Sequence, residues 1–162
     1  MDRESWWKGP NGEWYVVIQI ILFGLVALGP VTLPGWPAWD GLWRTISIVV
    51  GLILGGVGGL LVLAGLFSLG RNLTAVPRPK EDANMVEHGA YRWVRHPIYS
   101  GIILGAFGLS LLRGGWLGLL YALILFIFFD VKSRREENWL REKYDGYAAY
   151  QQRVCKLIPF LY

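Results

Sequence analysis

Residues 89–101 have the sequence Gly89-Ala90-Tyr91-Arg92-Trp93-Val94-Arg95-His96-Pro97-Ile98-Tyr99-Ser100-Gly101, which joins strongly polar side chains to the start of an apolar segment. That segment continues to residue 112 without a charged residue. Proline is pre-organised for the first position of a helix, so His96 is predicted to be the N-cap. The first-turn amides and the positive end of the helix dipole would then favour an anionic group beside His96. Ionisable groups at the mouth of a membrane-length segment are costly and usually mark a functional site.

The composition of the chain is typical of a membrane protein. Of its 162 residues, 54% are hydrophobic and only 17% are charged, whereas soluble domains carry roughly a quarter charged residues. This length has room for one compact domain, residues 1–162. The formal net charge of +4 comes from basic residues in predicted loops, which indicates membrane topology and not nucleic-acid binding. The single cysteine, Cys155, excludes an internal disulfide and argues against a cysteine-based metal site, so no metal is expected.

Four apolar segments are candidate membrane spans. The first two carry roughly the 20 residues that a helical span needs, and the last two are shorter. Because the Arg113-Gly114-Gly115 turn is tight, the last two are predicted to form an antiparallel hairpin that just spans, with Arg113 extending to the far surface. A buried re-entrant hairpin is the alternative. The predicted spans are residues 14–33, 45–69, 97–112 and 116–129.

Residues 131–152 have the spacing of an amphipathic helix, with Asp145-Gly146 as a candidate break. This helix is predicted to lie in the cytosol or at the membrane surface, over the loop that precedes residue 97. The predicted fold is therefore an all-α integral membrane protein with about four transmembrane helices and a C-terminal amphipathic cytosolic helix. Within the single domain, residues 14–69 form two N-terminal spans, and residues 70–162 carry the polar site.

The basic residues are divided unequally between the two predicted sides of the membrane. Of the 16 Lys and Arg residues, only Arg44 and Arg113 fall on one side, and the other 14 lie at the termini or in the loop between the second and third spans. The positive-inside rule then places both termini and this loop in the cytoplasm. It also places residues 89–101 on the same side as the C-terminal segment, as a shared site requires.

Glycines recur at helical spacing in the second and third apolar segments. This spacing predicts close helix packing through small faces. Gly101 and Gly105 have a second interpretation, in which they leave room for a ligand to lie against the backbone. The glycines concerned are Gly51, Gly55 and Gly59 in the second segment and Gly101, Gly105 and Gly108 in the third.

A second block near the C-terminus completes a recognisable pattern. Together, the two blocks resemble the isoprenylcysteine carboxyl methyltransferase family, whose members are membrane enzymes that use S-adenosylmethionine. The resemblance covers residues 70–162, and the first 69 residues match only as generic membrane helices. Tyr144-Asp145-Gly146-Tyr147 is one residue shorter than the usual form of this corner, so no role is carried over to Tyr147. The second block is Arg135-Glu136-Glu137-Asn138-Trp139-Leu140 followed by Tyr144, Tyr147, Tyr150, Arg153-Val154 and Pro159.

From the residues alone, each of these positions could also have a purely structural role. Arg95 could be a topology-setting arginine, His96 an N-cap with a satisfied ring, and the two glutamates a solvated helix face. The resemblance implies instead that they form a site, with Glu137 favoured over Glu136 for the cofactor contact. It implies catalytic roles for Arg95, Glu137 and Glu136, cofactor binding by His96, Tyr91, Tyr99, Gly101, Gly105 and Glu137, and substrate binding by Arg95 and Arg153.

The resemblance implies an integral-membrane methyltransferase that moves a methyl group from S-adenosylmethionine to a lipophilic acceptor. The expected acceptor is the carboxylate of a prenylated or similar lipid-tailed molecule. Membrane lipids are the other expected partners, with no nucleic acid and no required protein partner. The alternatives are a phospholipid or thiol methyltransferase, a sterol-reductase-like enzyme that uses NADPH, and a membrane scaffold without enzymatic activity.

Overall fold

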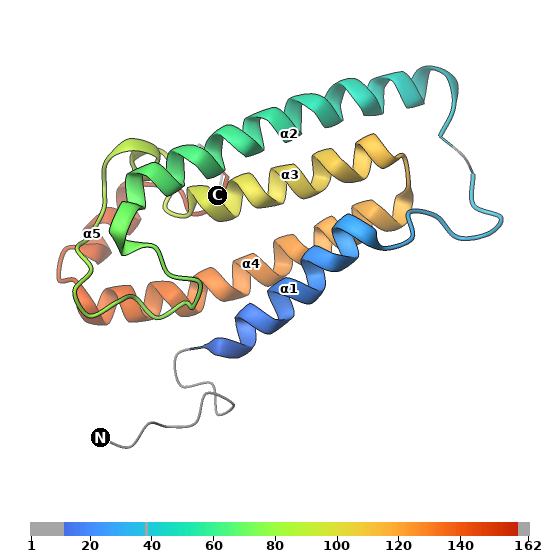
Figure 1. The fold of residues 1–162 in the computed structure, drawn as a ribbon. Helices are drawn as coiled ribbons and strands as arrows, with labels where there is room; N and C mark the ends of the chain where they lie inside the picture. The colour runs from blue at the N-terminus through green and yellow to red at the C-terminus, as the bar shows by residue number, and fades with distance from the viewer. Residues whose placement is uncertain (1–11, 38, 159–162) are drawn as a thin grey trace.

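The computed structural model describes residues 12–37 and 39–158, and within these residues every regular element is a helix. The four long helices run side by side (Figure 1). The α1–α2 connection and the α3–α4 turn lie at one end, and α5 lies at the other (Figure 1). The N-terminal basic residues Arg3 and Lys8, predicted to be cytoplasmic, and Pro159 of the second sequence block lie outside the described residues. The elements are α1 (Glu13–Leu28), α2 (Gly41–Leu69), η2 (Gly70–Asn72), η3 (Gly89–Arg92), α3 (Pro97–Arg113), α4 (Trp116–Lys143) and α5 (Tyr147–Arg153).

Glycines bring α2 and α3 into backbone contact. A Cβ on Gly58 would lie 2.6 Å from the Gly101 carbonyl oxygen, and one on Gly51 would lie 2.8 Å from that of Gly108. At the start of α3, a Cβ on Gly65 would meet the Ile98 side chain at 2.7 Å. The prediction of close packing is confirmed, but the α2 positions that carry it are seven residues apart. The spacing expected from the sequence is four residues. A seven-residue repeat instead keeps one face of α2 toward α3, because seven residues are close to two full helical turns.

Two arginines tie together the end of the bundle opposite α5. Arg44 donates hydrogen bonds to the carbonyls of Leu111 and Leu112 at 3.0 and 2.7 Å, at the C-terminus of α3. Arg113 does the same for α1, through the carbonyls of Val26 and Gly29 at 3.0 and 2.9 Å. A cation is favourable at a helix C-terminus, where carbonyls lack partners. The guanidinium of Arg113 thus lies at this end of the bundle and bonds to α1, and its extension to the membrane surface remains a prediction.

The helix lengths support part of the span prediction. Two helical stretches, Gly41–Asn72 and Trp116–Lys143, are long and apolar enough to cross a membrane. The apolar helices α1 and α3 have 16 and 17 residues, which gives α3 a length of about 25 Å. The first helix ends at Leu28 and not at residue 33, because Gly29 adopts an extended conformation before Pro30. A count of four spans remains a prediction.

The predicted boundary between the fourth span and the C-terminal helix does not exist. One helix, α4, runs from Trp116 to Lys143, and the break comes at residues 144–146, where Asp145-Gly146 was the candidate. Helix α5 then begins at Tyr147. Glu136 and Glu137 are consequently carried on a rigid extension of α4, about two turns beyond its apolar part.

The outer faces of the helices are apolar. On α2, Leu60 is 69% exposed and Phe67 is 84% exposed. A continuous apolar surface of this kind is characteristic of contact with a membrane or a partner. The buried core lies instead between α1, α3 and α4, where Val26, Ile103 and Phe129 belong to one hydrophobic cluster.

Candidate active site

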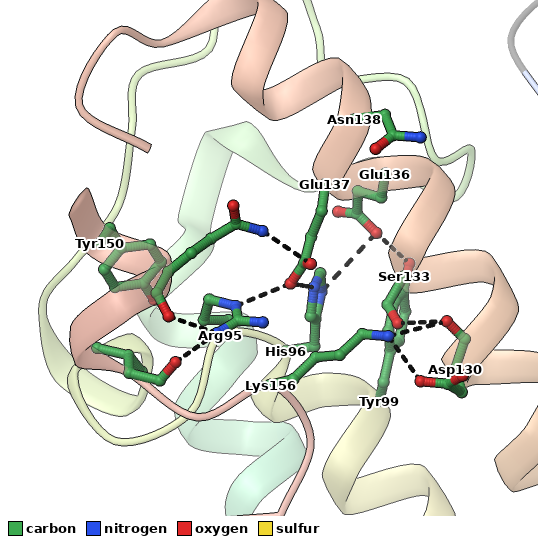
Figure 2. A network of polar contacts seen from close by, with 12 residues as sticks. Arg95, His96, Tyr99, Asp130, Ser133, Glu136, Glu137, Asn138, Tyr150 and Lys156 are labelled. Atoms are coloured by element: carbon green, nitrogen blue, oxygen red, sulfur yellow. Dashed lines mark hydrogen bonds and ion pairs between the residues drawn. The ribbon is translucent and has the colours of Figure 1, made fainter. Parts of the chain in front are cut away.

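The carboxylate of Glu137 is the centre of a buried polar network at the α5 end of the bundle (Figure 2). It accepts hydrogen bonds from Nε of Arg95 at 2.8 Å and from Nε2 of His96 at 3.1 Å, both at Oε1. Its second oxygen accepts a hydrogen bond from the Gln151 side chain at 2.9 Å. Both Glu137 and His96 are buried. The network thus joins the loop before α3 to α4 and α5.

Arg95 also anchors the C-terminal segment. Its Nη1 donates to the backbone carbonyls of Gln151 and Val154 at 3.0 and 2.5 Å. The backbone amide of Arg95 donates to the carbonyl of Cys155 at 2.8 Å. Nearby, the Lys156 ammonium pairs with Asp130 at 2.6 Å (Figure 2). Two of the three guanidinium nitrogens are therefore engaged within the protein.

Glu136 points to the other side of α4 and lines a cavity. Its Oε2 accepts a hydrogen bond from the Tyr99 hydroxyl at 2.7 Å, and Nδ1 of His96 lies 3.9 Å from the same oxygen (Figure 2). The rings of His96 and Tyr99 are stacked, with centroids 5.3 Å apart and planes at 4°. His96 is the N-cap of α3 and Pro97 is at its start, as predicted, and the ring is held between the two glutamates.

The cavity has a volume of about 240 Å³ and lies between the helices and the loop of residues 72–86. Its walls include polar residues from α3 and α4, apolar loop residues and five tyrosines. The loop is held in place by the Tyr144 hydroxyl, which donates to the Ala83 carbonyl at 2.6 Å. The polar and aromatic side chains that line the cavity include Gln19, Tyr91, Arg95, His96, Tyr99, Lys132, Glu136, Tyr144, Tyr147 and Tyr150.

Three tyrosines of this cavity, Tyr99, Tyr144 and Tyr150, donate hydrogen bonds through their hydroxyl groups. The Tyr150 hydroxyl donates to the Tyr91 carbonyl at 2.6 Å. Burial raises the pKa of Tyr91 well above its usual value, and the Glu136 charge raises it further. Burial likewise raises the pKa of Tyr150. Both phenols therefore stay protonated at neutral pH.

The structure brings together most of the residues that the sequence predicted. Tyr91, Arg95, His96, Tyr99 and Glu136 line the cavity. The exception among the acidic residues is Glu137, which is absent from the cavity wall and lies in the network described above. Glu136 therefore faces the cavity and Glu137 does not, and which of the two contacts the cofactor remains a prediction.

Besides Glu137, three predicted site residues lie away from the cavity. The Gly101 backbone faces α2, where a Cβ would collide with the Gly58 carbonyl oxygen. The Gly105 amide belongs to the same contact, 2.8 Å from the position of a Cβ on Gly58. Neither glycine lines the cavity, so these positions serve helix packing. Arg153 is exposed and pairs with Glu87 at 2.9 Å on the surface.

Lys132 and Gln19 are among the cavity residues that were not predicted. Lys132 was counted among the basic residues that set topology, yet it is 1% exposed and lines the cavity. Gln19 lies on α1 and accepts a hydrogen bond from the Lys132 ammonium at 2.7 Å. The sequence could have indicated Gln19 as a site residue, because it is a lone amide inside an apolar span. Its partner could not be found because the two residues are 113 positions apart.

Comparison with known proteins identifies the family. The model of the phospholipid methyltransferase family matches residues 46–146. The chain belongs to this family. The match covers α3, α4 and most of α2, and it includes Arg95, His96 and both glutamates.

Several known proteins resemble the chain over half of its length or more. A probable protein-S-isoprenylcysteine O-methyltransferase of Oryza sativa subsp. indica is 31% identical over 116 residues, which cover 69% of this chain and 61% of that protein. The enzyme of that name from Schizosaccharomyces pombe is 35% identical over 83 residues, 50% of this chain and 35% of the relative. The cobalt-zinc-cadmium resistance protein CzcN of Cupriavidus metallidurans is 26% identical over 93% of this chain and 63% of its own length. The chain thus spans about three fifths or less of these relatives.

A solved structure shares the fold. The eukaryotic intramembrane Ras methyltransferase ICMT, an isoprenylcysteine carboxyl methyltransferase, superposes with a TM-score of 0.64 at 23% sequence identity. The alignment covers 99% of this chain and 55% of ICMT. The predicted resemblance to isoprenylcysteine carboxyl methyltransferases is confirmed by these relatives and by this fold.

Proposed function

We propose that the chain is an integral-membrane methyltransferase that moves a methyl group from S-adenosylmethionine to a lipid-tailed acceptor. One observation carries the proposal. Polar residues of both sequence blocks line one cavity at the end of an apolar helical bundle. Among them, Glu136 lies beside His96 and Tyr99. Membership of the phospholipid methyltransferase family supports the same activity.

The residues around the cavity fit S-adenosylmethionine chemically. This molecule has an aromatic purine, a cationic sulfonium and ammonium, and a carboxylate. The cavity offers tyrosine rings, the carboxylate of Glu136 and the ammonium of Lys132. When bound, S-adenosylmethionine supplies a methyl group activated by a sulfonium. We assign its binding to Tyr91, His96, Tyr99 and Glu136, with Glu137 as the residue that positions His96.

The chain's own residues hold the reactants in line and exclude water, which are the main contributions that such a transfer needs. If the acceptor is a carboxylate, it is already anionic and no base has to remove a proton. Glu137 fixes Arg95 and His96 by hydrogen bonds of 2.8 and 3.1 Å. Its role is therefore orientation. The stacked His96 and Tyr99 rings keep one wall of the cavity rigid.

The acceptor is proposed to enter sideways from the bilayer. The cavity wall includes Leu69, Ile98 and Ile102 at the ends of apolar helices, so a lipid tail could stay in the membrane while its head group reaches the polar residues. The relatives named for isoprenylcysteine favour the carboxylate of a prenylated or similar molecule as the acceptor. The family model favours a phospholipid head group as the second candidate.

The proposed orientation places the site at the cytosolic surface. Among the described residues, 12 Lys and Arg lie in the loop of residues 70–96 or in the region from residue 130 onward, and only Arg44 and Arg113 lie at the opposite end. At the opposite end, the α1–α2 connection and the α3–α4 turn are held together, because the Leu117 amide donates a hydrogen bond to the Val31 carbonyl at 3.0 Å. If α2 crosses the membrane, both turns lie at the same depth, which supports four spans with cytosolic termini.

Calorimetry of the purified protein tests the cofactor assignment. Titration with S-adenosylhomocysteine is expected to give saturable binding, and titration with NADPH is expected to give none. Binding of NADPH alone would refute the methyltransferase and favour a sterol-reductase-like enzyme. Binding of neither ligand would favour a scaffold without enzymatic activity.

A further inference from the structure

Lys132 is a buried cation without an acidic partner. It is 1% exposed, on the first turn of α4 beyond the apolar part. Its ammonium donates to the Gln19 side chain at 2.7 Å and to the Ala75 carbonyl at 3.2 Å, and both acceptors are neutral. Within residues 12–37 and 39–158, no carboxylate forms an ion pair with it.

The surroundings of this ammonium are suited to a cation and face the cavity. The ammonium lies 5.3 Å from the centre of the Tyr99 ring and 5.9 Å from that of Phe129. Lys132, Gln19 and Ala75 all line the cavity. The charge of Glu136, one turn further along α4, acts on this ammonium, but the two groups form no ion pair. A buried cation whose direct contacts are neutral dipoles and ring faces is stabilised by a counter-ion bound against it.

The guanidinium of Arg95, which also lines the cavity, is already paired. Arg95 pairs with Glu137 at 2.8 Å, so its charge is balanced within the protein. Glu136 accepts the Tyr99 hydroxyl at 2.7 Å and is suited to the cationic part of a ligand. The positive charge that a ligand anion can balance is therefore that of Lys132.

We propose that Lys132 binds a ligand carboxylate in the cavity. This inference rests on the proposed function, in which two carboxylates are available: the amino-acid carboxylate of the methyl donor and the carboxylate of the lipid-tailed acceptor. It replaces Arg95 as the main anion-binding residue of the site. A purely structural Lys132, tying α1 and the loop of residues 72–86 to α4, is the rival explanation.

The test compares ligands that differ only in the carboxylate. Full-length wild-type protein, Lys132→Met and Lys132→Gln are titrated with S-adenosylhomocysteine and with its decarboxylated form, S-adenosyl-3-thiopropylamine. The steady-state KM and kcat are also measured for N-acetyl-S-farnesylcysteine. Lys132→Arg keeps the charge and is expected to retain binding. Arg135→Met is the matched control, because Arg135 lies on the exposed face of the same helix and stacks on Trp139.

Two results would support the proposal and identify the source of the carboxylate. If the donor supplies it, both neutral variants will bind S-adenosylhomocysteine about tenfold to a hundredfold more weakly, with unchanged affinity for the decarboxylated ligand. If the acceptor supplies it, the KM of the farnesylated acid will rise by a similar factor, with unchanged cofactor affinity.

Two other results would overturn it. Equal weakening of both adenosyl ligands, with no change in the KM of the acid, would show a structural role. Unchanged affinities and KM in both variants would show that the ammonium contacts no ligand. A wild-type protein that binds neither adenosyl ligand would refute the proposed function itself, and this inference with it.

Discussion

The Nε atom of Arg95 lies 2.8 Å from the Glu137 carboxylate, although the two residues are 42 positions apart. Their side chains are only 11% and 6% exposed. The pair fixes the loop before α3 against α4 and, through further contacts of Arg95, against the segment that follows α5. A buried pair of this kind makes each partner dependent on the other, because removal of one leaves an uncompensated charge.

Replacement of Glu137 by alanine should therefore lower stability. The substitution leaves Arg95 and Gln151 without their acceptor, and breaking a buried pair costs about 3–5 kcal/mol. Thermal unfolding in detergent should show a clearly lower midpoint for Glu137→Ala than for wild type. A midpoint within a degree of wild type would contradict the account of this network.

Replacement of Glu136 should instead affect ligand binding. Its side chain is 25% exposed and accepts a hydrogen bond from Tyr99, so Glu136→Ala should fold. Loss of a charge-assisted contact to the ligand costs about 1.5–3 kcal/mol, or roughly tenfold to over a hundredfold in affinity. Calorimetry with S-adenosylhomocysteine measures this. Full affinity in a folded Glu136→Ala protein would remove this residue from the cofactor site.

The surface pair of Arg153 and Glu87 provides the contrasting case. Both side chains are largely exposed, at 65% and 43%, and exposed pairs contribute little to stability. We expect Arg153→Ala to bind S-adenosylhomocysteine with affinity within twofold of wild type. The KM of the acceptor should also be unchanged. An increase in that KM would restore the role in substrate binding that the family resemblance implies.

The contact between α2 and α3 should not tolerate a side chain at Gly58. A Cβ there would lie 2.6 Å from the Gly101 carbonyl oxygen, which belongs to the backbone and cannot move aside freely. Gly58→Ala is expected to destabilise the protein by about 1–3 kcal/mol. Gly56→Ala on the same helix meets nothing within 4 Å and should be neutral or slightly stabilising. Equal unfolding midpoints for the two variants would refute the backbone contact.

Cysteine labelling tests the orientation. In a Cys155→Ser background, Lys80→Cys and Asp145→Cys should react from the cytosolic side and Thr32→Cys from the opposite side. Position 32 reports on both turns, since Val31 is bonded to Leu117. The turn at Gly115 is unsuitable because a Cβ would collide with the Val31 carbonyl. Labelling of all three positions from one side would contradict four spans.

The sequence predicted the helical class, the N-cap at His96 and most of the cavity residues, because these follow from local patterns. It did not predict the continuity of α4, since the change from apolar to charged residues resembles a boundary while the backbone continues unbroken. The different roles of Glu136 and Glu137 were also beyond reach. Adjacent residues of one helix point in different directions, and only the positions of Arg95 and Tyr99 show which direction faces the cavity. Lys132 was missed because its burial depends on α1.

The most direct test of the central claim is methyl transfer in liposomes containing the purified protein. Labelled S-adenosylmethionine is supplied with matched carboxylic acids that do or do not carry an isoprenoid tail, and with a phosphatidylethanolamine as the phospholipid alternative. We expect the labelled methyl group to be transferred to the acid with the isoprenoid tail, with little transfer to the acid without it. Transfer to none of these acceptors, by a protein that binds S-adenosylhomocysteine, would contradict it.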